Sequence, residues 1–197
     1  MSKLPLGWKE VTLGDVGLYH NGYSFKSSEW KSEGRPIISI QNLTNPKKPF
    51  NYFQGDIKPE NEIDDGDFLI SWSGTLGAFL WNRGPAVLNQ HIFKVESFID
   101  QKYHYYLVSK FIAYLYTRTR GTGLAHVTKP EFEGTKVPLA PLEEQLNIAK
   151  KLDIVFDKIS FARETVEQVE EDLERISQSL INFVSSCLQF DDVNFID

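Results

Sequence analysis

Amide and cationic side chains gather in short polar stretches of the first two thirds of this 197-residue sequence. Several of these stretches carry glycine or proline, which is typical of loops and turns. Amide groups can hydrogen-bond base edges and Lys or Arg groups can neutralise phosphates, so the mixture is typical of nucleic-acid binding. The candidates for such contacts are Lys26, Gln41, Asn42, Lys47, Lys48, Arg83, Gln90, Arg118, Arg120 and Lys129.

Charge limits this interpretation, because ordinary polar surface is the alternative for each residue taken singly. The net charge of −6 argues by itself against a nucleic-acid partner. The charge is unevenly distributed: residues 1–142 carry sixteen Lys and Arg against fourteen Asp and Glu, whereas residues 143–197 carry five against thirteen. The acidity therefore belongs to the tail, and the front region is free to have a basic face.

No pattern for catalysis, a cofactor or a metal is found in the sequence. It has neither a GxxxxGK[ST] phosphate loop nor a GxGxxG motif after a strand. The segment 45–50 (NPKKPF) has the wrong spacing for the Asn-Pro-Pro-aromatic motif of adenine methyltransferases, and the four histidines lack metal-ligand spacing. The acidic run 64–67 is interpreted as a turn. We therefore expect no cofactor or metal in this chain.

The number of cysteines and the length of the apolar runs indicate the cellular setting. Cys187 is the single cysteine, so no internal disulfide is expected. No apolar run approaches the ~20 residues of a membrane helix, and no signal-peptide pattern follows Met1. These features predict a soluble cytoplasmic protein that does not enter a membrane.

One long helix is predicted for the tail, because no proline or glycine follows Pro141. Steps of four and three residues from Ile148 meet only apolar residues, which is the pattern of a coiled coil. Its members are Ile148, Leu152, Val155, Ile159, Ala162, Val166, Val169, Leu173, Ile176, Leu180, Phe183, Cys187 and Phe190. The predicted division is a front domain over 1–141, a helix over 142–190 and a tail over 191–197.

The alternative for this stripe is an amphipathic helix that lies on its own domain. A stripe of this extent spans about 63 Å, whereas a globular domain of ~140 residues is only some 30 Å across. We therefore expect the helix to pair with a helix of another subunit.

The front domain is predicted to mix helices and strands, which gives an α+β fold class overall. Short strands are expected at 37–40, 68–73, 78–81, 87–95 and 135–139. A helix is expected over 101–118. A second, short helix is indicated by Thr128-Lys129-Pro130-Glu131, a capping box with proline in the first turn.

Four stretches in order resemble the specificity subunits of type I restriction–modification systems. They are 4–9 with 11–16 (LPLGWK, VTLGDV), 22–27 through Trp30 to 36–40 (GYSFKS, PIISI), 66–77 with Asn89-Gln90 (GDFLISWSGTLG), and 137–145 (VPLAPLEEQ). The departure from the family pattern is length, since members usually hold two recognition domains and two helices in one chain. The resemblance implies a half-length subunit with one target-recognition domain.

The resemblance also implies a function and a set of partners. The chain would bind double-stranded DNA without catalysis of its own, and direct methylation subunits, and in some complexes restriction subunits, to a bipartite site. S-adenosylmethionine, ATP and Mg would be bound by those subunits. The helix would pair with a second copy or with another half-subunit, and two identical copies would read a palindromic, interrupted site.

Two other functions remain open from the residues alone. The aromatic content of 13% could serve a protein- or glycan-interaction module that a coiled coil makes dimeric. Steep weakening by salt would separate DNA binding from that alternative. A hydrolase that uses an Asp/Glu pair would need activity without partners.

Overall fold

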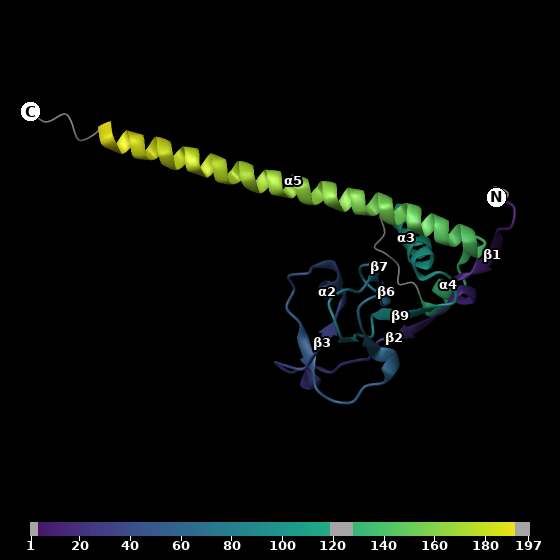
Figure 1. The fold of residues 1–197 in the computed structure, drawn as a ribbon. Coiled ribbons are helices and arrows are strands. Elements are labelled where there is room, and N and C mark those ends of the chain that lie inside the picture. The colour runs from purple at the N-terminus through teal and green to yellow at the C-terminus, as the bar shows by residue number, and fades with distance from the viewer. Residues whose placement is uncertain (1–3, 119–127, 192–197) are drawn as a thin grey trace, which may run out of the picture. The chain divides into compact units, whose positions relative to one another are not determined.

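The structure is a computed structural model that describes residues 4–118 and 128–191, with side-chain surroundings for 4–114 and 128–187. Its fold is α+β, with short strands and helices before one long helix (Figure 1). The chain divides into two compact units, 1–149 and 150–197. The helix α5 begins at Leu142, so its first two turns belong to the first unit.

A two-stranded sheet brings the start of the front unit to its end. Strand β1 (Lys9–Thr12) pairs antiparallel with β10 (Lys136–Leu139). The helix α1 (Leu13–Val16) follows β1, and α4 (Lys129–Glu133) precedes β10. The capping box predicted for α4 is confirmed, because Thr128 and Glu131 cap each other. The buried Gln145 then fixes the start of α5. Its side-chain amide donates a hydrogen bond to the Ala140 carbonyl and accepts one from the Asp100 backbone N–H.

The main core lies on an antiparallel sheet of order β2-β9-β6-β7. Its strands are β2 (Gly17–Asn21), β6 (Phe68–Ser71), β7 (Gly77–Leu80) and β9 (Ile92–Ser97). Helix α3 (Gln101–Arg118) is present as predicted and contributes Val108 to the same apolar cluster. Aromatic rings dominate this cluster, with Tyr19, Phe68 and Phe93 fully or almost fully buried.

A buried histidine ties α3 to the main sheet. His104 lies 2.9 Å from the Tyr19 hydroxyl and 2.9 Å from the Ser97 hydroxyl, one on each ring nitrogen. Because the Tyr19 hydroxyl donates to the Leu13 carbonyl, it is placed to accept a hydrogen bond from His104. Burial lowers the pKa of His104 to about 4, so the ring is neutral at pH 7.

A second four-stranded sheet has the order β4-β3-β8-β5 and its own apolar cluster, which includes Ile38, Trp81 and Leu88. Its strands are β3 (Arg35–Ile38), β4 (Asn51–Phe53), β5 (Glu62–Ile63) and β8 (Ala86–Leu88). The short helix α2 (Ile40–Thr44) lies between β3 and β4, and the 3-10 turns Ser27–Glu29 and Pro59–Asn61 complete the unit.

Three strand predictions were wrong in extent, and one of them, 68–73, ends at Ser71. The expected strand 87–95 is two strands in different sheets, because Asn89, Gln90 and His91 form a turn between β8 and β9. The expected strand 37–40 ends at Ile38, since Ile40 already belongs to α2. At 39–40 an apolar residue follows one polar residue, and at 89–91 three polar residues separate two apolar strands, so hydrophobicity alone does not mark where each strand ends.

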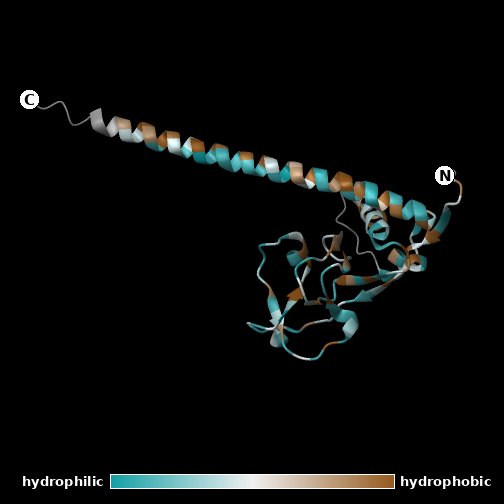
Figure 2. Cartoon of the chain, in the orientation of Figure 1, coloured by the Kyte–Doolittle hydropathy of each residue, from teal (hydrophilic) through white to brown (hydrophobic). Residues whose placement is uncertain are grey.

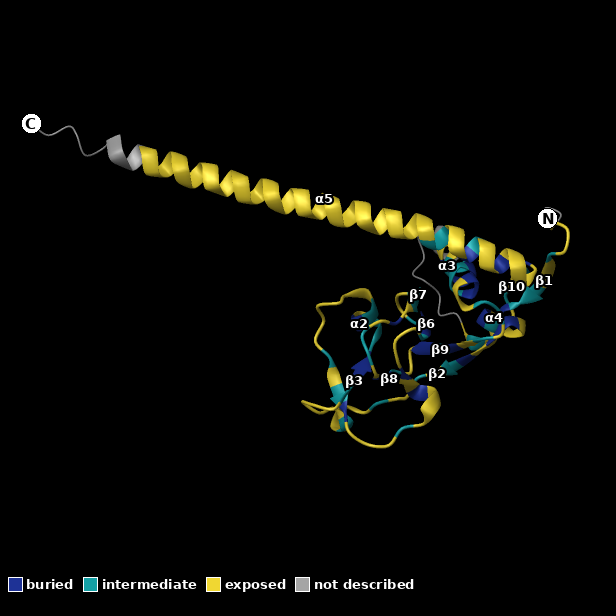
Figure 3. Cartoon of the chain, in the orientation of Figure 1, coloured by how far each residue is buried: buried dark blue, intermediate teal, exposed yellow. Residues whose placement is uncertain are grey.

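The long helix α5 (Leu142–Asp191) is continuous over 50 residues. Figure 2 shows hydrophobic residues recurring along it, and Figure 3 shows that its described part beyond the first turns is exposed. Leu173 and Phe183, for example, are 60% and 65% exposed. Ile148, the first residue of the stripe, packs against the front-unit core instead. The side chain of Phe190 lies outside the described residues.

Candidate nucleic-acid interface

Four of the predicted contact residues lie on one segment, the α2 loop, which comprises residues 39–51. Gln41, Lys47 and Lys48 are exposed on it. The segment contains neither Asp nor Glu. Amide and ammonium groups without a neighbouring carboxylate in the segment suit an anionic ligand that carries hydrogen-bonding edges.

The fourth residue, Asn42, is buried and holds the loop together. Its Oδ1 accepts hydrogen bonds from the backbone N–H and the hydroxyl of Ser39, at 3.1 and 2.5 Å. Its Nδ2 donates to the carbonyls of Lys48 and Pro49, at 3.1 and 3.2 Å. An amide has two donors and two acceptor sites, so that of Asn42 is fully used. We therefore assign Asn42 a structural role.

Arg83 lies beneath the α2 loop. Its guanidinium stacks over the Trp81 ring at 4.4 Å and over the Phe50 ring at 5.5 Å. Nη2 donates to the Asn42 carbonyl, while Nη1 is buried and has no hydrogen-bond partner among the described residues. Desolvation lowers the pKa of Arg83 from its usual value. Both terminal nitrogens therefore face protein.

Gln90 is brought beside the α2 loop by the turn after β8. The Asn89 backbone N–H donates to the Ile38 carbonyl, and the Gln90 N–H donates to the Tyr23 carbonyl. Gly22 makes this junction possible, because a Cβ there would lie 2.3 Å from the Asn89 carbonyl oxygen. The Gln90 side chain itself is exposed, with its Nε2 3.4 Å from the His91 ring.

The other predicted residues lie elsewhere. Lys26 is exposed at the start of the 3-10 turn Ser27–Glu29. Lys129 donates to the Tyr19 carbonyl at 2.7 Å and pairs with Glu133 at 3.6 Å, so its ammonium group is already engaged. Arg118 ends α3, but its side chain and the whole of Arg120 lie outside the described residues.

A groove of about 560 Å³ runs along the α2 loop. Its amide groups include those of Gln41, Asn51 and Asn89, and Lys48 supplies a cation. Trp30, Phe50 and His91 add aromatic surface, and no carboxylate is among the lining residues. The lining includes Gln41, Asn42 and Lys48, three of the residues that the sequence analysis had named.

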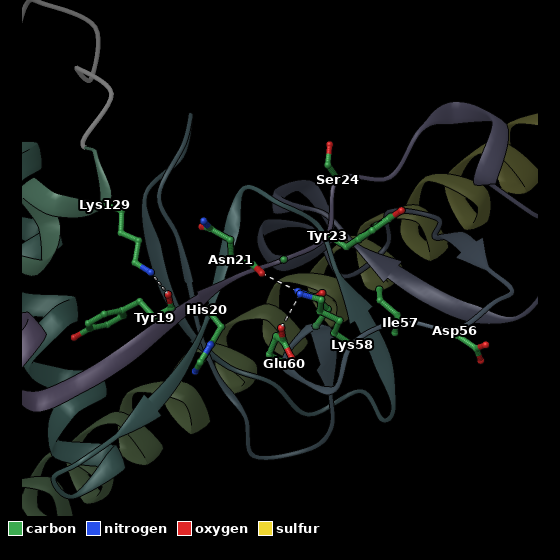
Figure 4. Close-up of a pocket in the computed structure, with 12 residues that line it drawn as sticks. Tyr19, His20, Asn21, Tyr23, Ser24, Asp56, Ile57, Lys58, Glu60 and Lys129 are labelled. Carbon is green, nitrogen blue, oxygen red and sulfur yellow. Dashed lines mark hydrogen bonds and ion pairs between the residues drawn. The ribbon is translucent and has the colours of Figure 1, made fainter.

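A larger pocket of about 750 Å³ beside β2 has different chemistry (Figure 4). Its lining contains the carboxylates Asp56 and Glu60. Lys58 pairs with Glu60 at 3.6 Å, and Lys129 is held as described above. The cations of this pocket are therefore partly neutralised, and we regard the α2 loop and its groove as the better candidate for a polyanion.

Trp30 was not among the predicted contact residues, although this residue is 47% exposed and lines the groove. An isolated tryptophan gives no periodic signal, so only its position beside the loop marks it. Among the described residues, no cluster of His, Cys, Asp or Glu could hold a metal ion. Nor is any described helix long and apolar enough to span a membrane.

Taken together, the fold and this surface define a class: a mixed α and β recognition domain followed by a long helix with an uncovered apolar stripe. Comparison with known proteins then identifies the family. The model of the type I restriction modification DNA specificity domain matches residues 5–171, and the chain belongs to this family.

Similar proteins carry the same description. The chain is 27% identical over 195 residues to the specificity subunit of the type I restriction enzyme EcoBI from Escherichia coli, and 31% identical to the putative MjaX specificity subunit of Methanocaldococcus jannaschii. These alignments cover 96% and 92% of this chain but 41% and 44% of the relatives. The chain thus spans less than half the length of these relatives.

Solved structures agree at the level of the fold. The HsdS subunit of Thermoanaerobacter tengcongensis superposes with a TM-score of 0.63 at 21% identity, over 92% of this chain and 45% of that one. A chain from a type I R-M system studied for complex assembly and conformational transition gives a TM-score of 0.69 at 22% identity, over 92% of this chain and 46% of that one.

Proposed function

We propose that this chain reads DNA sequence for a type I restriction–modification complex, as a specificity subunit with one recognition domain. The observation that carries the proposal is the α2 loop, which presents Gln41, Lys47 and Lys48 without a carboxylate, in a chain of the DNA specificity family. Amide groups can contact base edges, and ammonium groups can contact the flanking phosphates. Lys26 and Gln90 are further exposed candidates, and Arg118 and Arg120 keep the role expected from the sequence.

The chemistry of modification is assigned to partner subunits. The chain would position methylation subunits, which use S-adenosylmethionine, and in some complexes restriction subunits, which use ATP and Mg. This division of labour is supported by the absence from the sequence of the phosphate-loop and methyltransferase motifs that such chemistry uses. The chain itself would be non-catalytic and cytoplasmic, and would bind no cofactor.

The exposed stripe of α5 would pair with the same helix of a second copy. In an antiparallel pair the apolar layers match as Leu152–Phe183, Val155–Leu180, Ile159–Ile176, Ala162–Leu173 and Val166–Val169. This register also places Arg163 within two residues of Glu170 of the other copy. A parallel pair would instead place Lys158 beside Arg163. Charge therefore favours the antiparallel arrangement.

Apolar residues off this stripe leave surface for a second kind of partner. Ile154, Phe161 and Ile181 are 47%, 72% and 56% exposed and lie on the outer side of the proposed pair. We assign this surface to a methylation subunit.

Selection of a randomised duplex library tests the proposed function. The full chain is incubated with the library, with and without the methylation subunit of a type I system, and the bound DNA is sequenced. We expect one interrupted, palindromic motif, bound with an affinity that falls steeply with salt because counterions are released. Absence of any enriched motif, or binding that salt does not weaken, would leave an interaction module for protein or glycan as the function.

A further inference from the structure

The placement of Arg83 is unlike that of a residue that contacts DNA. A phosphate contact needs an N–H that faces solvent, but one terminal nitrogen of Arg83 bonds the Asn42 carbonyl and the other is buried. No carboxylate pairs with this guanidinium among the described residues. Aromatic rings stabilise it instead, at 4.4 Å from Trp81 and 5.5 Å from Phe50.

Arg83 is itself held firmly from below. Trp81 is 3% exposed, and its indole N–H donates to the Gly84 carbonyl at 2.6 Å. The Gly84 N–H donates to the Asp65 carboxylate at 2.7 Å. Gly84 has a φ of +75°, a conformation that other residues rarely adopt, so the turn is built for one geometry. The guanidinium therefore extends from a rigid base.

The two groups that Arg83 touches are anchors of the α2 loop. Asn42 is 2% exposed and its amide joins Ser39 to Lys48 and Pro49, which brings the two ends of the loop together. Phe50 packs against the apolar cluster of the second sheet. The carbonyl of Asn42 lies in the last turn of α2, where carbonyls lack helical partners and a cation is favourable.

We propose that Arg83 is a positioning residue for sequence recognition: it clamps the buried anchors of the α2 loop and so fixes the exposed Gln41 and Lys48 for DNA. The inference rests on the proposed function and deepens it. Base readout requires amide groups placed within a few tenths of an ångström, whereas phosphate attraction tolerates movement. Loss of the clamp therefore removes discrimination between sequences and leaves general affinity for DNA.

Two variants test the clamp without removing charge from the surface. Arg83→Lys keeps the positive charge but cannot stack as a plane on two rings. Phe50→Leu removes one of the rings and leaves Arg83 in place. Lys47→Ala serves as the comparison for a phosphate contact. Near-ultraviolet circular dichroism of each full-length variant reports whether the front unit is folded.

The first measurement compares binding to the duplex that the wild-type chain selects with binding to a scrambled duplex, over a series of salt concentrations. We expect both clamp variants to lower the ratio of the two affinities about tenfold. The salt dependence of their binding should stay the same as in the wild type. Lys47→Ala should instead weaken both duplexes and lower the salt slope by about 1. A third variant, Arg83→Gln, removes the positive charge. Wild-type selectivity in Arg83→Lys, or a salt slope reduced in Arg83→Gln as in Lys47→Ala, would overturn the clamp.

A second measurement needs no DNA. Hydrogen exchange of the α2 loop amides should become at least about tenfold faster in both clamp variants, while exchange in β6 and β9 stays as in the wild type. Unchanged exchange in the loop would contradict the inference even if DNA selection succeeds. If the wild-type chain selects no sequence, the proposed function fails and the recognition role of Arg83 falls with it; faster loop exchange would then report only a structural clamp.

Discussion

The front unit and the long helix differ in the exposure of their apolar residues. Phe68, Phe93 and Val108 in the front unit are fully buried by neighbouring elements of the same chain. On the helix, Leu173, Ile176 and Leu180 are each more than half exposed. Burial of apolar surface is the main favourable term in folding, so the front unit supplies its own stability, whereas the stripe of the helix gains nothing from burial within this chain. The proposed roles in recognition and assembly therefore belong to separate parts of this chain.

Polar substitution of the helix stripe gives the largest expected effect. In Leu173→Glu/Ile176→Glu, the proposed interface would bury four carboxylates per pair of chains, which is strongly unfavourable. We expect the dissociation constant of the dimer to rise by more than about a hundredfold. Sedimentation equilibrium of the full chain measures this change.

The matched control is Gln168→Glu/Gln178→Glu, which adds the same charge outside the stripe. This variant should remain a dimer, and unfolding of the front unit should be unchanged in both proteins. A dimeric Leu173→Glu/Ile176→Glu protein would show that the stripe is not the interface.

A substitution in the core tests the burial of apolar residues in the front unit. Phe93 is fully buried, stacked on Trp72 at 5.5 Å and edge-on to Tyr19 at 6.0 Å. Phe93→Ala should lower the free energy of unfolding of the front unit by about 3–5 kcal/mol. Urea unfolding followed by tryptophan fluorescence measures it. Phe98→Ala, at a 57% exposed position, should change stability by less than about 0.5 kcal/mol. Equal effects of the two variants would contradict the assigned core.

Acid should weaken the front unit through His104. Its pKa is about 4 in the folded chain, against 6.5 for the exposed ring, so the unfolded chain binds the proton more tightly. The stability tied to the neutral ring is complete above pH 6.5 and is lost as the pH falls toward 4. The difference amounts to about 3 kcal/mol. Urea unfolding between pH 7 and 4 measures the loss, and His104→Gln should flatten the profile by a similar amount. A profile unaltered by this substitution would rule out His104 as the source.

Reversal of one interhelical charge pair gives the smallest expected effect. Arg163→Glu should weaken the proposed antiparallel dimer by about 0.5–1 kcal/mol for each of its two pairs with Glu170, because exposed ion pairs contribute little. Glu170→Arg in the same chain should restore the affinity. Sedimentation at low and high salt measures both. Failure of the second change to restore affinity would argue against the antiparallel register.

Local and periodic features account for the part of the fold that was predictable. Three helices were predicted from patterns that relate residues only a few positions apart. These are the helix over 101–118, the capped helix α4, and the long helix that the absence of proline and glycine after Pro141 indicates. The turn at Asn89–His91 was missed because β8 and β9 belong to different sheets. No short window of sequence records which sheet a strand will join.

The candidate site shows the same limit. The sequence predicted the same DNA-contacting role for Gln41, Asn42 and Arg83. Only their positions in the fold distinguish their roles. Gln41 is exposed, whereas Asn42 is 2% exposed and Arg83 lies under the loop on the ring of Trp81. Arg83 and Asn42 are 41 residues apart. The type of a polar residue therefore predicts which hydrogen bonds it can make. Its burial decides whether the partner is another part of the protein or a ligand.

The sequence by itself determined that this chain combines a mixed α and β domain with one long striped helix, because propensity and periodicity act within a few turns of chain. Its motifs also indicated the family. The tertiary structure alone decided which polar groups remain available, because hydrogen bonds and ring contacts between distant segments satisfy some of them and leave others exposed. The placement of Arg83 against Asn42 and Phe50 of the α2 loop is the outcome of those long-range contacts.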